Sequence, residues 1–473
     1  MIRTLVALVV VGCACKGSTH EGPLAEPSGA DPWGAPAQAA AAKPTDTPEA
    51  RKQRAEQALA RVAVIMPKLA KLRGLAFAHD VPREYQTTAD FRAFVRAETA
   101  ASLPPDRAAD TSAALFQLGL LDRPGDLAAL EQQAMTTQAG AYYDSQKKKF
   151  FLVMVPPTDL MLDMMSAHEL THALQDQHFD LDKLLPPGPA TDALDDDHVS
   201  ARRFVAEGDA TFTMFLYVLG SMGKEVTPDL VKIMRAQLDQ FATMSPEDML
   251  RQNVLGMSAN LDPELQTSLE GFGNIPSTVL VPMMDSYLRG SQVIATAYDR
   301  GGWKAVDALY ADPPESTEQV LHPSTKLFPE RDHPKTVTIA PLAHGTQIAS
   351  LVFGELQWQV YFQLWVPTQK AIASEGWAGD RATVTRRSDG RLVARIATTW
   401  DTPKDAAELR AAFITSLAAR FPKGGGDPLA AGFDRGDGAG KIFIAERGDA
   451  VFIVDGADAR SELADLVAAT QIR

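Results

Sequence analysis

The segment 168-HELTHALQDQHF-179 determines how the rest of the chain is interpreted. It contains three histidines, and Glu169 directly follows the first of them. Residues four positions apart on a helix lie about 40° apart around the axis and one turn along it. His168 and His172 would therefore point in the same direction and could share one metal ion, with Glu169 beside them. The H-E-x-x-H pattern on a helix is typical of a zinc site in which the glutamate acts as general base.

The residues before this motif favour a buried helix. The preceding segment 160-LMLDMMSA-167 is mostly apolar, and Thr158 can cap a helix that runs from about Asp159 to His178. An apolar segment directly before the motif is typical of a helix that is buried at the floor of a cleft. The alternative is an ordinary surface helix that happens to carry two histidines, and the apolar flank disfavours it.

The third histidine, His178, lies ten residues after His168, which is the spacing of the third zinc ligand in metzincins. In that pattern a glycine breaks the helix so that the third histidine can return to the metal. Here Gln175 stands at the glycine position, and nothing between residues 173 and 177 favours a break. We therefore expect a continuous helix, on which His178 lies about 80° off the ligand face and serves as a C-terminal cation or cap.

A stronger candidate for the third ligand is Glu207, 35 residues after the second histidine of the motif. It lies in a predicted helix over about 199–219, whose second half is apolar on nearly every side and therefore buried. A buried carboxylate needs a compensating partner, and a metal ion is the strongest one available. The alternative is an ion pair with Arg202 or Arg203. Asp209 would point to a different face and would support the site or cap the helix.

Four segments carry a resemblance to a known family: "HELTHALQDQHFDL", "AEGDAT", "PPESTEQVLHP" and "GWAGDR". From about residue 72 to the C-terminus the chain resembles bacterial secreted and lipoprotein-type gluzincins, which are thermolysin-like zinc peptidases. The resemblance implies a zinc ion held by His168, His172 and Glu207, Glu169 as general base, and a peptide or protein substrate. One departure is that Thr211 stands where thermolysin has an aspartate four residues after the ligand glutamate. The partner that orients a ligand histidine is therefore unassigned.

A peptidase also needs a donor for the oxyanion that develops on the substrate carbonyl. Gluzincins often supply a histidine or tyrosine from a region after the ligand helix. His322, in the proline-bounded loop "PPESTEQVLHP", is the first candidate, and Tyr287 in "YLRG" is the second. The alternatives are that His322 organises its own loop and that Tyr287 packs in the core.

A β-hairpin is predicted directly before the motif helix. Tyr142 and Tyr143, a polar turn, and the strand Phe150–Val155 give this pattern. In thermolysin-like folds an edge strand at this place pairs with an extended substrate through backbone hydrogen bonds. We expect the strand Phe150–Val155 to be that edge. Tyr143 could then reach the cleft, although packing within the hairpin is the more common role for such a residue.

The N-terminus predicts export. Residues 1–13 contain a basic residue, a short apolar run and Val-Val-Gly before Cys13, which resembles the lipobox of bacterial lipoproteins. We expect lipidation of Cys13, a flexible tether over 14–48, and a location in the bacterial cell envelope, with the lipid anchor as the only membrane contact. The alternative is a plain secretory signal. Both cysteines, Cys13 and Cys15, lie in this segment, so no disulfide is expected in the folded part.

The bulk composition fits a folded protein of two or three domains. The chain has 473 residues, 45% of them hydrophobic and 22% charged, with a formal net charge of −14. That charge argues against a nucleic-acid partner. We predict an α+β fold, mostly α, with a zincin-like catalytic domain over 49–334 and a C-terminal α+β domain over 335–473. An alternative to the peptidase is a non-catalytic, zinc-containing envelope lipoprotein that acts as a binding module.

Overall fold

The computed structural model describes residues 47–137, 140–156, 158–188, 190, 191, 194–223, 225, 227–242 and 275–473. The predicted signal peptide and lipobox (1–13), Cys13 and nearly all of the tether (14–48) lie outside the described residues. The sequence pattern also predicts a helix over 226–260, of which only the part up to residue 242 is described. No helix among the described residues is long and apolar enough to span a membrane.

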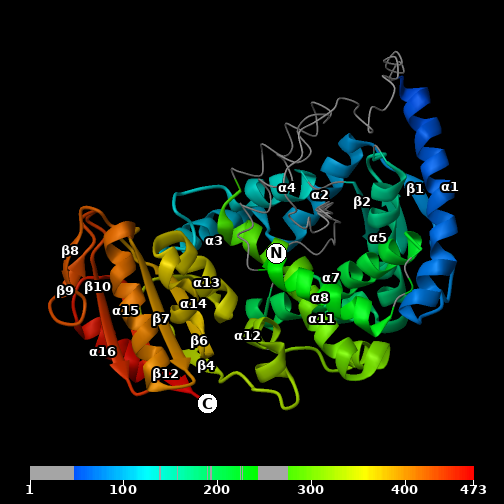
Figure 1. The fold of residues 1–473 in the computed structure, drawn as a ribbon. Helices are drawn as coiled ribbons and strands as arrows, with labels where there is room; N and C mark the ends of the chain where they lie inside the picture. Colours follow the sequence, from blue (N-terminus) through cyan, green and yellow to red (C-terminus); the bar gives the residue numbers. More distant parts are fainter. Residues whose placement is uncertain are drawn as a thin grey trace, which may run out of the picture.

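The fold is α+β and mostly helical, as predicted (Figure 1). The α-helices are α1 (Pro48–Arg73), α2 (Thr88–Ser102), α3 (Pro105–Gln117), α4 (Leu127–Thr137), α5 (Asp159–Phe179), α6 (Leu181–Leu184), α7 (Asp196–Ser221), α8 (Pro228–Ala242), α11 (Ser277–Ala311), α12 (Thr317–Leu321), α13 (Gly354–Trp365), α14 (Lys370–Ser374), α15 (Pro403–Arg420) and α16 (Ser461–Ala469). The strands are β1 (Arg83–Tyr85), β2 (Ala141–Asp144), β3 (Lys149–Leu152), β4 (Val337–Ile339), β5 (Thr346–Leu351), β6 (Trp377–Arg386), β7 (Leu392–Trp400), β8 (Gly425–Asp427), β9 (Gly432–Asp434), β10 (Lys441–Arg447), β11 (Ala450–Ala457) and β12 (Thr470–Ile472). Two short turns of other helix types, η1 (Pro323–Leu327) and η2 (Pro367–Gln369), complete the set.

Three long helices, α5, α7 and α11, form the centre of the helical part, and α1 runs along its outer side (Figure 1). Thr158 caps α5 by accepting a hydrogen bond from the amide of Met161, as its position in the sequence predicts. Helix α1 is attached to α5 by Arg61, whose guanidinium pairs with Asp159 at 2.8 Å and with Asp163. The motif helix is therefore enclosed by helices on two sides.

The predicted hairpin is present, but the expected edge strand is wrong. The small sheet has the order β1-β3-β2, so Phe150–Leu152 lies in its middle strand and β2 lies at the edge. Strand β3 ends at Leu152, three residues before the predicted end. The reason is a long-range pairing: β1 adds in parallel to β3, with Arg83 opposite Phe150 and Tyr85 opposite Leu152. Because β1 has only three residues, it has no distinct local sequence pattern, and its pairing with β3 far downstream could not be predicted.

The larger sheet has seven strands in the order β5-β6-β7-β11-β10-β9-β8. Side chains of a strand alternate between faces, and β11 illustrates the result. Val451 and Ile453 pack with α13 and α15 on one face, whereas Phe452 and Val454 pack with α16 on the other. Helix α3, from the N-terminal half, joins the first of these cores through Ala114. Both faces of the sheet are thus covered.

Several local predictions in the second half of the chain can be compared with the structure. The sequence predicts two helices between residue 276 and about residue 312, broken at Gly301 and Gly302, and this break is confirmed, because both glycines have non-helical backbone angles and Gly302 has a φ of 62°. The sequence pattern also predicts a single helix over 351–375, and this prediction is wrong, since α13 ends at Trp365 and α14 begins at Lys370. Strand β5 was not predicted. Its residues are mixed in burial and do not alternate cleanly.

Buried carboxylates join the helical part to the larger sheet. Asp197, at the start of α7, accepts hydrogen bonds from the backbone amide and the hydroxyl of Thr317 at 3.0 and 2.5 Å. Gly354 has a φ of 64°, and a Cβ there would lie 1.7 Å from the Asp197 carboxylate. A glycine is therefore needed where α13 begins against α7.

The "GWAGDR" segment has a structural role at the same junction. Asp380 accepts hydrogen bonds from the indole N–H groups of Trp358 and Trp377 at 3.1 and 2.7 Å, and from the amide of Phe353 at 2.8 Å. Burial raises the pKa of the Asp380 carboxyl to about 6. The sequence suggests an ion pair between Asp380 and Arg381, and in the structure the Arg381 side chain donates to the Val337 carbonyl at 3.3 Å. Asp380 thus ties α13 to the sheet.

Candidate metal centre

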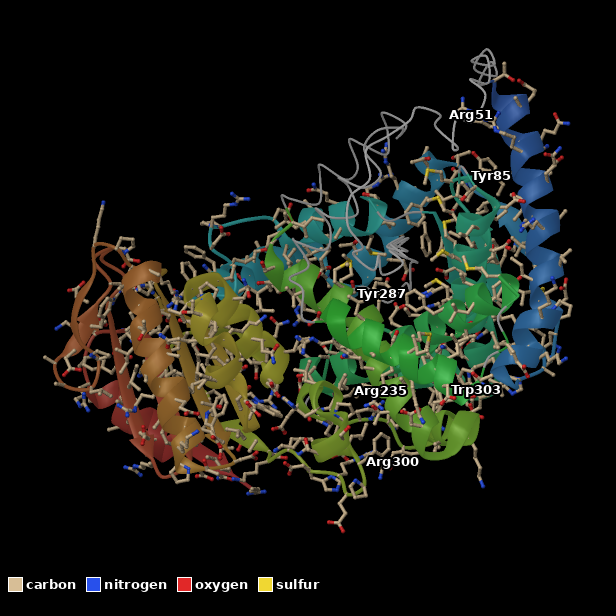
Figure 2. All side chains as sticks on the ribbon, in the orientation of Figure 1. Arg51, Tyr85, Arg235, Tyr287, Arg300 and Trp303 are labelled. Atoms are coloured by element: carbon tan, nitrogen blue, oxygen red, sulfur yellow. The ribbon has the colours of Figure 1, made fainter. Side chains whose placement is uncertain are left out.

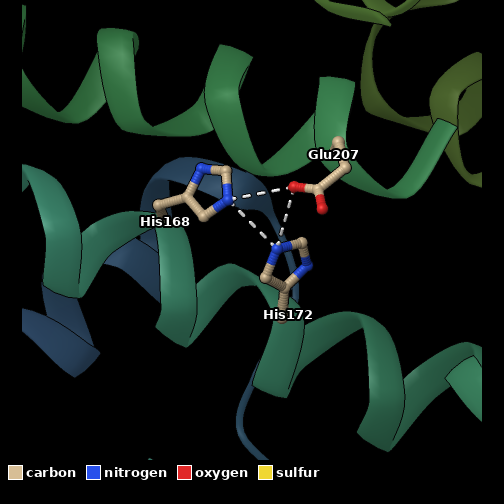
Figure 3. Close-up of side chains that lie close together, drawn as sticks. All are labelled: His168, His172 and Glu207. Carbon is tan, nitrogen blue, oxygen red and sulfur yellow. Dashed lines mark hydrogen bonds and ion pairs between the residues drawn. The ribbon is translucent and has the colours of Figure 1, made fainter. Parts of the chain in front are cut away.

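The structure brings His168, His172 and Glu207 together between α5 and α7 (Figure 3). The two histidine Nε2 atoms lie 3.1 Å apart. Glu207 Oε2 lies 3.2 Å from Nε2 of His168 and 3.4 Å from Nε2 of His172. All three side chains are buried. One atom of each residue therefore faces the same small volume.

These three atoms fit a zinc ion. A tetrahedral zinc with nitrogen and oxygen ligands about 2.0–2.1 Å away holds the ligand atoms about 3.3 Å from one another. The three separations of 3.1, 3.2 and 3.4 Å agree with that value. Although burial opposes ionisation of Glu207, His168 and His172 lower the pKa of its carboxyl to about 2. A carboxylate and two imidazoles form a donor set that suits zinc, with the fourth position left for water or substrate.

The two arginines predicted as alternative partners of Glu207 do not bond to its Oε2 atom, which faces the two histidines. Arg202 donates to the carbonyl of Leu184, and the charge of Arg203 acts on Glu207. A second group of carboxylates, Glu318, Asp332 and Asp401, also lies close together. This group surrounds the ammonium of Lys326, which already supplies a positive charge.

His178 lies away from the cluster. Helix α5 continues without a break through Gln175 to Phe179, so the expected continuous helix is confirmed. The Nε2 atom of His178 lies 2.7 Å from the carbonyl oxygen of Ala76, to which it donates, and the residue is exposed. The spacing that resembles a metzincin therefore does not bring a third histidine to the other two.

Gln175 is the partner of His172 that sequence reasoning missed. Its Oε1 accepts a hydrogen bond from Nδ1 of His172 at 2.8 Å. Its Nε2 donates to the carbonyl of Ala206 at 2.9 Å and to Asp209 at 3.3 Å. A histidine that donates through Nδ1 keeps the lone pair on Nε2, which is the atom that faces Glu207. The available signal was a buried amide three residues after the second histidine, on the same helix.

We predict that Gln175→Ala lowers the zinc affinity of the protein by about tenfold to a hundredfold, because His172 loses the group that sets its tautomer and ring orientation. The affinity is measured by competition with a chromophoric chelator. Gln177→Ala is the matched control, since Gln177 lies on the same helix and, within the described part of the chain, bonds to the backbone of residues 78 and 79. Equal zinc affinity in the two variants would contradict an orienting role for Gln175.

Glu169 is oriented by the edge strand of the small sheet. The backbone amide of Tyr143 donates to Glu169 Oε2 at 2.7 Å, and the Glu169 side chain is fully buried. Strand β2 is held in place by the Tyr143 hydroxyl, which donates to Asp176 at 2.7 Å. Asp176 in turn pairs with Lys148 from the hairpin turn. The side chain of Tyr143 therefore has its expected packing role, and its backbone amide orients Glu169, the candidate general base.

Tyr287 reaches the cluster from α11, where Figure 2 labels it. Its ring centroid lies 5.7 Å from that of His168. This approach depends on two glycines: a Cβ on Gly208 would lie 2.2 Å from the backbone of Gly290, so α7 and α11 touch without side chains between them. Burial, followed by the charges of Glu207 and Glu169, raises the pKa of Tyr287 well above its ordinary value. Its phenol therefore stays protonated at neutral pH.

His322 is placed elsewhere. Its Nε2 donates to Glu355 Oε1 on α13 at 2.9 Å, and this bond is the largest cause of a raised pKa for His322. The other charges that act on it are those of Glu318 and Glu375, and none of these residues belongs to the cluster. Of the two predicted oxyanion donors, the structure therefore brings only Tyr287 to His168 and Glu207.

A cavity of about 300 Å³ borders the cluster at Glu207 and Tyr287. Its walls come from α3, α4, α7, α11 and the segment from β5 to the start of α13. Most of the lining is apolar, with charged groups that include Arg203 and Glu131. A mostly apolar cavity with a few polar groups at one end is the usual form of a ligand site.

Comparison with known proteins covers only the end of the chain. Residues 342–466 match a family model described as a domain of unknown function, DUF8575. The matched residues begin just before β5 and end within α16. No curated protein and no solved structure matches the chain. The C-terminal part is therefore similar to DUF8575, and His168, His172 and Glu207 lie outside the matched residues.

Proposed function

We propose that this protein is a zinc-dependent peptidase of the gluzincin type, with a zincin-like catalytic domain over residues 49–334. The observation that carries the proposal is the meeting of His168, His172 and Glu207 with Glu169 next to them on α5. Two histidines and a carboxylate from two helices are the ligand set of gluzincins, and the general-base candidate directly follows the first ligand. The cavity at Glu207 and Tyr287 offers room for a substrate.

The roles of the side chains follow from their positions. A bound zinc ion supplies Lewis acidity, which polarises a peptide carbonyl and lowers the pKa of a water molecule towards neutrality. Glu169 takes a proton from the attacking water and passes it to the leaving amine. The Tyr143 amide, 2.7 Å from Glu169 Oε2, holds that carboxylate in one orientation during both transfers. Gln175 keeps His172 in the tautomer that leaves Nε2 without a proton.

We assign the oxyanion donor to Tyr287 in place of His322. Tyr287 lies beside His168, and burial, together with the charges of Glu207 and Glu169, raises the pKa of its hydroxyl so that it stays protonated at neutral pH. A neutral phenol can donate a hydrogen bond to the oxygen on which negative charge develops. His322 instead pairs with Glu355 and organises the junction between η1 and α13.

The proposed setting is the bacterial cell envelope, with Cys13 as the lipidated residue and a peptide or protein as substrate. The N-terminal sequence pattern and the family resemblance support this setting. In this arrangement the tether over 14–48 separates the peptidase from the membrane, and the C-terminal domain over 335–473 supplies part of the cavity wall.

We predict that Glu169→Gln lowers the rate of peptide hydrolysis by about 10²- to 10⁴-fold while the variant still binds about one zinc ion per chain. The amide keeps the shape of the side chain but cannot accept the proton. The measurement is cleavage of a broad peptide library by the zinc-loaded protein, read by mass spectrometry, beside metal analysis. Glu84→Gln is the control, because Glu84 is exposed on β1 and pairs with Lys149.

The alternative, a zinc-containing lipoprotein that only binds a partner, predicts a different result. In that case the zinc-loaded protein cleaves no member of the library, and Glu169→Gln behaves like the wild type in every assay. That outcome would overturn the peptidase proposal and leave the metal site intact.

A further inference from the structure

The outer edge of β5 borders the cavity that reaches Glu207. Strand β5 is the first strand of the seven-stranded sheet and pairs with β6 on one side only. Among the described residues, no backbone group bonds to its other side. Such an edge presents a row of amide and carbonyl groups that can pair with another extended chain.

The cavity follows this edge instead of a face of the sheet. It is lined by five consecutive residues, 348–352, which include β5 from Ile348 onward. Side chains of a strand alternate between the two faces, so a cavity that lay on one face would contact every second residue. A register shift between Gln347 and Ala349 breaks the alternation at Ile348, but residues 349–351, which follow it within β5, also all line the cavity, and this places the cavity along the backbone edge.

Helix α3 supplies another part of the cavity wall. Helix α3 contributes Arg107, Thr111 and Leu115, which are spaced four apart and form one stripe along the helix. Glu207 and Tyr287 line the same cavity. A strand-like segment in this space would have the β5 backbone as a partner and would contact a mixed polar and apolar wall.

We propose that an extended segment of the substrate polypeptide adds to the outer edge of β5 as a further strand, and that the bond to be cleaved lies farther along the same chain, at Glu207. This inference rests on the proposed peptidase function for the identity of the occupant. It makes the substrate an unfolded or extended polypeptide, recognised through its backbone at a distance from the reacting bond. It also gives the segment that matches DUF8575 a role in substrate binding.

The first experiment uses the zinc-loaded full chain with Glu169→Gln, and casein as an unfolded probe. Amide hydrogen exchange is measured across β5 with and without casein. We expect rapid exchange of the outward amides of residues 346–351 in the free protein and slower exchange when casein is bound. Full protection in the free protein, or no change with casein, would overturn the proposal.

The second experiment uses two neighbouring proline variants, Ala349→Pro and Ser350→Pro. Adjacent residues of an antiparallel strand direct their amides to opposite sides, so one variant breaks a bond to β6 and the other removes an outward donor. We expect the outward variant to keep its melting temperature and to bind casein about tenfold more weakly. If casein affinity is unchanged in the variant that remains folded, the proposal is wrong.

The two proposals can fail separately. Cleavage of casein by the wild type at an unchanged kcat/KM in the outward proline variant would retain the peptidase and overturn strand addition. Protection of β5 by casein, in a protein that cleaves nothing, would retain strand addition and overturn the peptidase. A dimer in light scattering that the outward proline variant dissociates would identify a second copy as the occupant, against this proposal.

Discussion

Glu207→Ala is expected to abolish both zinc binding and peptide hydrolysis, the largest functional effect that any single substitution should have in this protein. The variant leaves two neutral imidazoles on α5 and removes the only negative charge from the ligand set. Two histidines alone neither complete the coordination of zinc nor balance its charge in a buried site. Metal analysis after dialysis should fall from about one zinc ion per chain to background.

His178→Ala is the matched comparison for this prediction. A site of the metzincin type would lose its metal in His178→Ala and keep it in Glu207→Ala. In the structure His178 is exposed and bonds to the Ala76 carbonyl, so we expect this variant to bind zinc and cleave peptides as the wild type does. The reverse pattern in the two variants would contradict the proposed ligand set.

Arg73→Ala is expected to have the largest effect on stability, about 3–5 kcal/mol in the free energy of unfolding. The Arg73 side chain is fully buried, and its guanidinium lies 2.9 Å from Asp209 and 2.6 Å from Asp307. It also lies over the ring of Trp303, which Figure 2 labels, at 4.4 Å. Removal of Arg73 would leave the buried carboxylate of Asp209 without its positive partner. Urea unfolding measures the loss.

Two further variants test the cause of this loss. Arg61→Ala, on the same helix, breaks ion pairs of a partly exposed arginine and should cost only about 0–1 kcal/mol. The double variant Arg73→Met with Asp209→Asn removes both buried charges and should be more stable than Arg73→Ala alone. A loss for Arg73→Ala no larger than that for Arg61→Ala would show that the buried charge is not the cause.

The Arg73 network also reaches the metal centre. Asp209 accepts hydrogen bonds from Gln175 and from Tyr310, and Gln175 holds His172. Asp209, predicted to support the site or to cap its helix, also bonds directly to Arg73 of the outer helix α1, so that His172 is three hydrogen-bonded steps from Arg73 through Gln175 and Asp209. The sequence contained every member of this chain, but Arg73, Asp209 and Tyr310 are more than a hundred residues apart. Local periodicity carries no information about such pairs.

Features set by short-range patterns were predictable. The cap at Thr158, the uninterrupted course of α5 past Gln175, and the break at Gly301 each depend on neighbours within one or two turns. The same reasoning removed His178 from consideration, because a helix without a break fixes the direction of every side chain on it. The hairpin before α5 was predictable for the same reason, since its turn residues and strand residues are contiguous.

Features set by long-range contacts required the structure. In the small sheet β3 is the central strand and β2 is an edge strand, because β1, which lies far upstream in the sequence, pairs with β3. Because α7 and α11 touch at Gly208 and Gly290, the ring of Tyr287 lies next to that of His168. His322 lies elsewhere, where it donates a hydrogen bond to Glu355. The sequence by itself thus determined the course of the long helices α5 and α7 and the faces they present. Only the tertiary structure decided which of those faces meet, because packing depends on side chains that lie far apart along the chain.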